Sequence, residues 1–143
     1  DQLQAHFDAE GDLPALPVMP ASLMIEGMAQ TAGILVGSCR KFEEKVILAK
    51  IVTARFDAEV LPGDVIRYDA TLDRIDDAGA ATSGAVALMR APRAEWVPLG
   101  QVDLMFSHVD QNMAGLAFPE ENFVFDENLS GILRTAGHPD LVL

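Results

Sequence analysis

Apolar positions dominate one continuous segment near the start of the chain. From Pro20 to Gly37 the residues are apolar around nearly the whole circumference of a helix, and polar Ser22, Glu26 and Gln30 recur at every fourth position. Proline favours the first turn of a helix and glycine favours its end, so this pattern predicts one long helix with a narrow polar line. A helix with so small a polar face is normally buried. We therefore expect the Glu26 carboxylate to be buried and either paired or retained for chemistry.

Further along the chain, the apolar period changes to one typical of strands. Lys45–Phe56 is a nearly continuous run of apolar residues, which predicts a buried strand. Val65–Ile75 alternates between apolar and polar positions, as a strand with one buried face does. Ala80–Arg90 and Trp96–His108 are the next two predicted strands, and Pro98 predicts an edge position or a bulge in the last one.

Turn signals between these segments predict how the strands connect. Leu61–Asp64 contains Pro-Gly-Asp and Asp76–Gly79 contains Asp-Ala-Gly, both typical of turns. One long helix followed by an antiparallel meander predicts an α+β domain whose sheet wraps around a central helix. Residues 1–143 are expected to form a single domain with its core at about residues 6–106. In the extension at 107–143, four residues predict packing against the domain: Phe118, Phe123, Val124 and Phe125.

Composition and charge exclude several classes of protein. The chain has 143 residues, of which 50% are hydrophobic, and no segment reads as a membrane span. The single cysteine, Cys39, excludes an internal disulfide and is compatible with a reducing, cytoplasmic location. A net charge of -12 argues against nucleic-acid binding, which needs a basic surface.

Basic residues gather in one short stretch of this acidic chain. Arg40, Lys41 and Lys45 follow the predicted helix, and Lys50 and Arg55 lie in the next strand. Lysines commonly protect the edges of sheets, so one interpretation of the stretch is a solvated helix end and strand edge. Alternatively, Arg40, Lys41 and Lys45 could dock an acidic partner.

Several short motifs occur together along most of the chain. They are His6-Phe7, Pro17–Ala21, Leu23–Glu26, Met28–Gln30, Ala49–Ile51, Ala54–Phe56 and Val60–Asp64. In this order they resemble the β-hydroxyacyl-acyl-carrier-protein dehydratases of fatty acid synthesis, which have the hotdog fold. The chain departs from the family pattern in a longer loop between His6 and Pro17, in Ala21 where glycine is usual, and in starting close to the His-Phe pair.

The resemblance implies dehydration of a 3-hydroxyacyl thioester, without a metal or an organic cofactor. His6 would be the base that removes the C2 proton, and Glu26 would be the acid or would orient the leaving water. The amides near Ala21 and Ser22 would face the thioester carbonyl, because a helix N-terminus favours developing negative charge. Gln30, one turn from Glu26, could hydrogen-bond its carboxylate.

The resemblance also implies a substrate site shared between subunits. The residues expected to bind substrate are Met19, Pro20, Ala21, Ser22, Leu23 and Gln30. Met24 and Met28 could line a tunnel for the acyl chain together with Met19 and Leu23. In this family the histidine and the carboxylate of one site come from different subunits, which implies a homodimer or a higher homo-oligomer, with an acyl carrier protein as partner.

Two other functions remain open at the level of sequence. A hotdog thioesterase would use its carboxylate to activate water at the thioester carbonyl. A dehydratase-like domain with an altered loop between His6 and Pro17 could instead bind acyl groups or serve as a dimeric scaffold. The His6-Phe7 pair favours dehydration over both.

Overall fold

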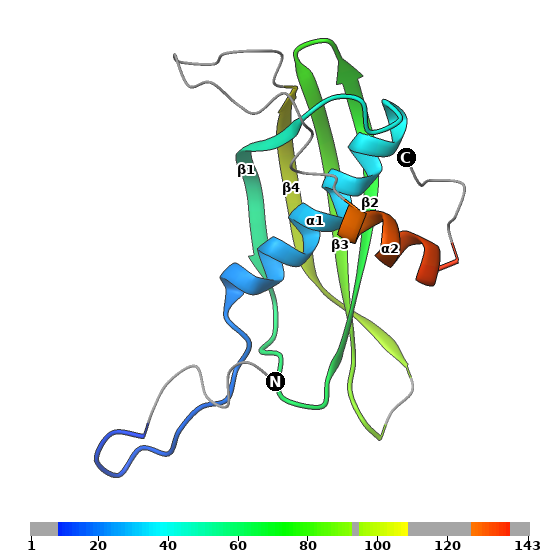
Figure 1. Ribbon diagram of the computed structural model, residues 1–143. Coiled ribbons are helices and arrows are strands. Elements are labelled where there is room, and N and C mark those ends of the chain that lie inside the picture. The colour runs from blue at the N-terminus through cyan, green and yellow to red at the C-terminus, as the bar shows by residue number, and fades with distance from the viewer. Residues whose placement is uncertain (1–8, 93–94, 109–126, 138–143) are drawn as a thin grey trace.

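One antiparallel sheet and one long helix form the body of the protein (Figure 1). The computed structural model describes residues 9–92, 95–108 and 127–137. Its elements are α1 (Ala21–Cys39), β1 (Val46–Phe56), β2 (Val65–Asp76), β3 (Gly79–Met89), β4 (Trp96–His108) and α2 (Glu127–Thr135). The α+β class and the single long helix predicted from the apolar pattern are confirmed.

The four strands lie in the order β1-β4-β3-β2, and every neighbouring pair is antiparallel. β2, β3 and β4 follow one another as hairpins, as the turn signals predict. The prediction of a simple meander is wrong for β1, which pairs with β4 rather than with β2. The chain passes from β1 at one edge of the sheet to β2 at the other, so that both edges are formed by the first two strands.

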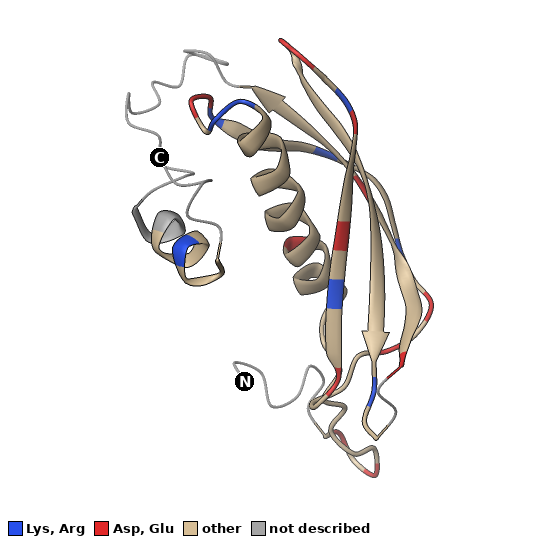
Figure 2. Cartoon of the chain, turned by 90° about the vertical axis from the view of Figure 1, so that its right-hand side faces the viewer, with Lys and Arg blue, Asp and Glu red and all other residues tan. Residues whose placement is uncertain are grey.

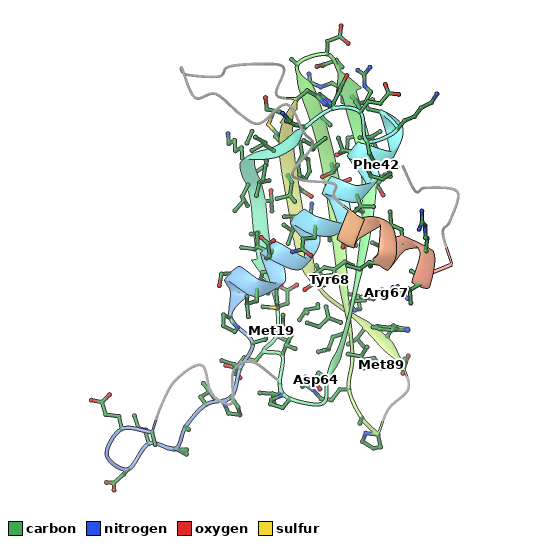
Figure 3. The ribbon with its side chains drawn as sticks, viewed as in Figure 1. Met19, Phe42, Asp64, Arg67, Tyr68 and Met89 are labelled. Carbon is green, nitrogen blue, oxygen red and sulfur yellow. The ribbon has the colours of Figure 1, made fainter. Side chains whose placement is uncertain are left out.

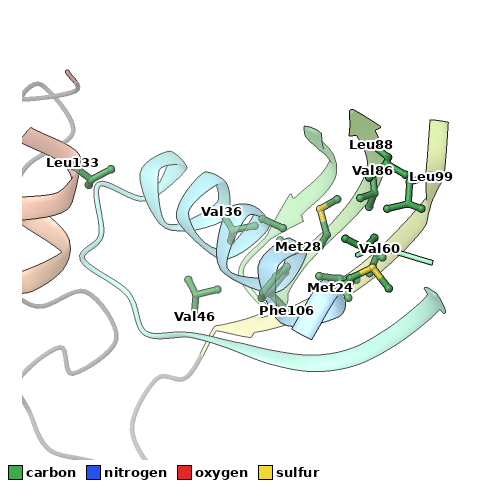
Figure 4. Close-up of a cluster of buried hydrophobic side chains, with 14 of the residues drawn as sticks. Met24, Met28, Val36, Val46, Val60, Val86, Leu88, Leu99, Phe106 and Leu133 are labelled. Atoms are coloured by element: carbon green, nitrogen blue, oxygen red, sulfur yellow. The ribbon is translucent and has the colours of Figure 1, made fainter. Parts of the chain in front are cut away.

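The core lies between α1 and the face of the sheet that curves around it (Figures 2 and 4). Met24, Met28, Ala32 and Val36 form a buried stripe along α1 at the spacing of helical turns. β3 and β4 supply the opposing layer, with the buried side chains Val86, Leu88, Leu99, Val102, Leu104 and Phe106. α2 lies on the other side of α1 from the sheet (Figure 2).

A glycine in the sheet lets the helix approach closely. A Cβ atom on Gly84 would lie 2.5 Å from the sulfur of Met28 and 2.6 Å from the carbonyl oxygen of Val102. Met28 is fully buried and occupies the space that a side chain at position 84 would need. The helix can therefore pack directly on β3 at this point.

The predicted burial of the first strand is wrong. β1 begins at Val46, which is buried, but most of its side chains are exposed, including Leu48 at 37%, Ile51 at 44% and Val52 at 53%. Among the strands that the structure describes, β1 has a neighbour on one side only and is an edge strand. Its apolar composition therefore leaves a long apolar edge open in the single chain.

The remaining strand predictions are confirmed in their main features. Along β2, the apolar side chains from Ile66 onward are half-buried toward α1, whereas Val65 and most of the alternating polar side chains are exposed. In the hairpin before β3, the amides of Ala78 and Gly79 donate to the Asp76 carboxylate at 2.9 and 3.2 Å. Pro98 lies at an irregularity in the β3–β4 register, beyond the last β4 residue paired with β1, so the predicted bulge is present in a central strand.

Most of the C-terminal extension lies outside the described residues. Phe118, Phe123, Val124 and Phe125 belong to that part, so their packing against the domain stays a prediction. Within the described part of the extension, Leu133 of α2 is buried. No helix among the described residues is long and apolar enough to cross a membrane.

Candidate functional site

The segment before α1 is fixed to the sheet connection by its backbone. The Met19 amide donates to the Val60 carbonyl oxygen at 2.8 Å, which holds the Pro-Val-Met-Pro segment beside the Leu61–Asp64 turn. Pro20 is the N-cap residue and provides no side-chain cap, while its carbonyl accepts from the amides of Leu23 and Met24. The amides of Ala21 and Ser22 therefore precede the first helical hydrogen bonds and, within the described part of the chain, are open donors at the positive end of the helix dipole.

Glu26 lies little more than one turn into α1, beside the polar residue that the sequence predicts as its partner. The Gln30 side-chain amide donates to Glu26 Oε1 at 2.9 Å. This hydrogen bond between residues four apart holds the carboxylate on one side of the helix. The predicted hydrogen bond between Gln30 and Glu26 is confirmed.

The expected burial of Glu26 is wrong for the single chain. Ser22, Leu23, Glu26 and Gln30 are all exposed, because the sheet covers only the opposite face of α1. Leu23 is 44% exposed, so this open face is partly apolar. The Glu26 carboxylate therefore projects from an open surface. A further layer of protein would have to cover this surface to exclude the carboxylate from water.

A pocket of about 260 Å³ opens between the segment before α1 and the turn before β2. It is lined by Pro17, Val18, Met19, Pro20, Leu23, Val60, Leu61, Pro62, Gly63, Asp64 and Ile66. Three of the residues expected to bind substrate, Met19, Pro20 and Leu23, share this pocket. The others, Ala21, Ser22 and Gln30, lie along the exposed helix face that carries Glu26. The residues expected to bind substrate thus lie on two neighbouring surfaces, and their role stays a prediction.

The methionines of α1 do not form a tunnel wall. Met24 is 4% exposed and Met28 is fully buried, and both pack in the core against the sheet. Met19 is the methionine of the expected set that lines the pocket. The expected tunnel is corrected to a core role for Met24 and Met28, because helical periodicity turns them toward the sheet and away from Glu26.

His6, the expected base, lies outside the described residues. The described chain begins at Ala9, in the loop that separates the histidine motif from the helix motif. The role of His6 therefore stays a prediction from sequence.

One wall of the pocket is held in place by a charged pair. Asp64 is buried at its side chain, and it accepts hydrogen bonds from Arg90 Nη2 at 2.8 Å and Arg90 Nε at 3.0 Å and from the Leu61 amide at 2.9 Å. The hydrogen bonds from Arg90 lower the pKa of the Asp64 carboxyl below its ordinary value. Arg90 Nη2 also donates to the Glu59 carbonyl oxygen at 2.8 Å. Figure 3 shows Asp64 at the same end of the sheet as Met19.

The pair escaped sequence reasoning because Asp64 and Arg90 lie 26 positions apart. The only sequence signal was the Leu-Pro-Gly-Asp turn itself, in which an aspartate commonly hydrogen-bonds a nearby backbone amide. Nothing in the local pattern indicates that the end of β3 supplies the arginine.

Comparison with known proteins decides the family. The family model described as the FabA-like domain matches residues 3–91, which is more than half of the chain. The chain belongs to the FabA-like domain family. The resemblance inferred from the short motifs is confirmed.

Curated relatives of this FabA-like domain are named as 3-hydroxyacyl-acyl-carrier-protein dehydratases FabZ. The protein from Pseudothermotoga lettingae is 44% identical over 63 residues, which are 43% of this chain and 44% of that protein. The protein from Solibacter usitatus is 30% identical over 112 residues, covering 77% of this chain and 65% of that protein. The chain thus spans less than two thirds of the length of the relatives it matches.

Solved structures agree with the hotdog fold. A hexameric thioesterase from Yersinia pestis superposes on 76% of this chain and 87% of its own with a TM-score of 0.59. Its sequence is only 14% identical, so the likeness establishes the fold of this FabA-like domain and nothing about its chemistry.

The basic residues of the expected docking site lie around the loop that follows α1. Arg40 is engaged within the chain, because Nη2 lies 3.3 Å from Asp77 Oδ1 and Nε lies 4.0 Å from Glu44 Oε2. Lys41 is exposed in this loop and Lys45 is half-buried just before β1. Lys41 is therefore the most accessible cation of this loop for an acidic partner.

A buried histidine lies beside the same loop. His108 Nδ1 is 2.8 Å from Glu44 Oε2, and the His108 side chain is only 2% exposed. Neither ring nitrogen makes an aligned hydrogen bond in the described part of the chain. This contact joins the end of β4 to the loop after α1, so the role of His108 is structural.

Among the described residues, no group of three or more histidine, cysteine and acidic side chains could hold a metal ion.

Proposed function

We propose that this protein dehydrates 3-hydroxyacyl thioesters carried by an acyl carrier protein, giving trans-2-enoyl thioesters. The observation that carries the proposal is the placement of Glu26, held by Gln30 at 2.9 Å and little more than one turn from the open amides of Ala21 and Ser22. A carboxyl group and a set of amide donors at this separation can serve a hydroxyl and a carbonyl of the same small substrate. Membership of the FabA-like family and the FabZ relatives support this chemistry.

The reaction removes a proton from C2 and a hydroxyl group from C3. His6 takes the C2 proton as base, and the electron pair of that bond becomes the new C2–C3 double bond. Glu26 gives a proton to the departing hydroxyl, which leaves as water. The Ala21 and Ser22 amides donate to the thioester oxygen, where negative charge develops during proton removal.

A second copy of the chain is part of the proposal. The helix face that carries Glu26 is open in the single chain, and catalysis by a weak acid is more effective where bulk water is excluded. The exposed apolar edge at β1 offers a surface for pairing. We place the histidine of one protomer against the carboxylate of the other in a homodimer or a higher homo-oligomer. The related thioesterase from Yersinia pestis is described as hexameric, which supports self-association of this fold.

The substrate would be held by two surfaces. The acyl chain fits the apolar pocket at Met19, Pro20 and Leu23, and the thioester lies toward the first turn of α1. We propose that Lys41, with Arg40 and Lys45, contacts the acidic carrier protein. Cys39 is exposed and unable to form an internal disulfide, which fits a cytoplasmic location.

A direct assay tests the reaction. Incubation with a 3-hydroxyacyl thioester should give the absorbance of a conjugated enoyl product without release of free thiol. Because Glu26 is exposed, Glu26→Gln should fold normally and lose most turnover, typically about a hundredfold or more for a general acid. Glu95→Gln removes an exposed carboxylate just before β4, away from Glu26 and from the proposed docking loop, and serves as the matched control.

The same assay separates the other functions. Thiol release without an enoyl product would show a thioesterase, and neither product would indicate an acyl-binding or scaffold domain. Full turnover by the Glu26→Gln variant would reject the role given to this carboxylate.

A further inference from the structure

A second cavity lies beside the pocket at Met19, with the charged pair between them. It has a volume of about 280 Å³, and its lining includes Leu88, Arg90 and Val97. Arg90 thus lines the second cavity, while its hydrogen-bond partner Asp64 lines the pocket. The Asp64–Arg90 pair therefore stands at the boundary between the two spaces.

One row of apolar side chains passes beneath both spaces. Ile66 of β2 pairs with Leu88 of β3, and Leu88 pairs with Val97 of β4. Paired residues of an antiparallel sheet point to the same face, and Leu88 is buried in the core on the side of α1. Ile66 lines the pocket, whereas Leu88 and Val97 line the second cavity. The two spaces thus share a continuous apolar floor.

The Arg90 side chain extends from the end of β3 to the segment that leads into β2. Its Nη2 donates to the Glu59 carbonyl oxygen and to Asp64 Oδ2, both at 2.8 Å, and its Nε donates to Asp64 Oδ1 at 3.0 Å. The Asp64 side chain is 5% exposed. The guanidinium group is therefore fixed from two sides at the boundary of the pocket.

The pocket is small without the second cavity. Its volume of about 260 Å³ is below the roughly 300–1,000 Å³ of most small-molecule sites. A long acyl chain would need the second cavity as well, and to enter it the chain would have to displace the hydrogen bonds between Asp64 and Arg90. An apolar chain end offers no hydrogen bond in return, so this displacement is unfavourable.

We propose that the Asp64–Arg90 pair is the end wall of the acyl pocket and restricts the protein to short-chain 3-hydroxyacyl thioesters. The inference rests on the proposed function, and it adds the class of substrate that the site selects. Asp64 and Arg90 determine specificity, because they meet the far end of the acyl chain and not its reacting carbons. Without this wall, the site would extend over the Ile66–Leu88 floor into the second cavity.

Removing the wall tests the inference. The open variant, Asp64→Asn/Arg90→Ala, loses both charges, while the new amide oxygen can still accept from the Leu61 amide. We expect the ratio of kcat/KM for a long-chain over a short-chain substrate to rise by about tenfold or more, because one methylene in an apolar pocket already changes specificity by about tenfold. This ratio does not depend on the fraction of enzyme that is folded.

An exposed pair on the other face of β2 supplies the matched control. Arg67 Nε lies 2.9 Å from Asp69, and both side chains are about half exposed, at 49% and 55%. Their positions alternate with Ile66, so they point away from the pocket. Asp69→Asn/Arg67→Ala should leave the chain-length ratio unchanged.

A bulkier side chain in the second cavity identifies where the longer chain goes. Val97 is 46% exposed, so Val97→Phe has room to fold. In the open variant, this substitution should return the ratio toward the wild-type value. In the wild type it should leave the ratio unchanged, because the acyl chain does not reach Val97. Wild-type protein that converts long chains as well as short ones would overturn the inference, and so would an open variant whose ratio does not rise or does not respond to Val97→Phe.

Binding measured apart from turnover separates this inference from the proposed reaction. Isothermal titration calorimetry with acyl-pantetheine analogues, in which an amide replaces the thioester, gives an affinity for each chain length without a reaction. A protein that dehydrates no substrate, but whose open variant gains affinity for long chains, overturns the reaction and supports the wall. An active protein whose open variant keeps the wild-type preference overturns the wall alone. A protein that binds no analogue of any length overturns both.

Discussion

The ring of Tyr68 lies directly against the backbone of Gly27. A Cβ atom at position 27 would come within 2.6 Å of Cζ and the hydroxyl oxygen of Tyr68. The residue next to Glu26 is therefore a glycine at the point where β2 packs on α1. This contact sets how close the helix lies to the strand, and with it the position of the helix face that carries the carboxylate.

Gly27→Ala should destabilise the protein even though alanine is the better helix former. The added methyl group overlaps the Tyr68 ring, so the ring or the helix has to shift, at a typical cost of about 1–3 kcal/mol. Gly33→Ala is the matched control, because its nearest neighbour would be a Phe106 ring carbon at an ordinary 3.8 Å. That variant should gain up to ~1 kcal/mol from helix propensity. Urea unfolding of both variants measures the difference, and equal stabilities would contradict the proposed overlap.

The Tyr68 hydroxyl should ionise only at unusually high pH. Burial raises the pKa of this phenol above its ordinary value of 10.0. Tyr68 is the only tyrosine in the chain, so the ultraviolet absorbance of phenolate reports this group alone. Because the folded state favours the protonated phenol, the contribution to stability is lost as the pH rises above 10.0. If the phenolate absorbance of the folded protein had its titration midpoint at or below pH 10.0, that result would be inconsistent with the burial of Tyr68.

Replacing Tyr68 by phenylalanine extends the same argument. The hydroxyl is buried and has no hydrogen-bond partner in the described residues. Tyr68→Phe should therefore be neutral or stabilising by up to about 1 kcal/mol at neutral pH. Thermal unfolding measures this, and a large loss of stability would reveal a hydrogen bond to the hydroxyl.

The Asp64–Arg90 pair should contribute to stability above mildly acidic pH. Asp64→Asn removes the charge from a buried carboxylate that accepts hydrogen bonds from two nitrogens of Arg90, Nε and Nη2, and should cost about 1–3 kcal/mol at pH 7. The folded-state pKa of Asp64 is lowered, so the stabilisation is complete above the ordinary carboxyl range and is lost as the pH falls through the lower folded value. Urea unfolding measures the free energy of unfolding of the variant and of the wild type at neutral and at acidic pH. The difference between the two proteins should be smaller at acidic pH.

An exposed pair supplies the control for this prediction. Asp69 lies 2.9 Å from Arg67 Nε, and both side chains are about half exposed, at 55% and 49%. Asp69→Asn should change stability by no more than about 0.5 kcal/mol, because solvent screens exposed pairs. Equal losses from the two substitutions would show that burial of Asp64 is not what strengthens its pair.

Charge reversal at Lys41 tests the proposed docking of a carrier protein. Lys41→Glu should raise the KM for a carrier-linked substrate by about two- to fivefold, as expected for one exposed charge, and leave the KM for a small thioester unchanged. Arg74→Glu is the control, since Arg74 is exposed on the sheet and pairs with Asp76 at 3.5 Å. An equal change for both substrates would argue against docking at this loop.

Local pattern was sufficient for the elements of this fold. Short stretches of sequence indicate α1 by its apolar period, β2 by its alternation, and the turns before β2 and β3 by their residues. These signals are local because they depend on backbone preference and on the spacing of apolar side chains. The hydrogen bond from Gln30 to Glu26 was also predictable, since residues four apart meet on a helix. The motifs between His6 and Asp64 were together enough to indicate the family, because their residues and their order are both specific to it.

The tertiary structure decided which surfaces these elements cover and which they leave open. An apolar run such as β1 has the same period at a sheet centre and at an edge, so only the strand order shows that Ile51 and Val52 face solvent. Glu26 is exposed because the single sheet covers just one face of α1, which its all-round apolar composition could not reveal. Pairing between distant residues such as Asp64 and Arg90 depends on where the chain returns, and no local preference encodes that return.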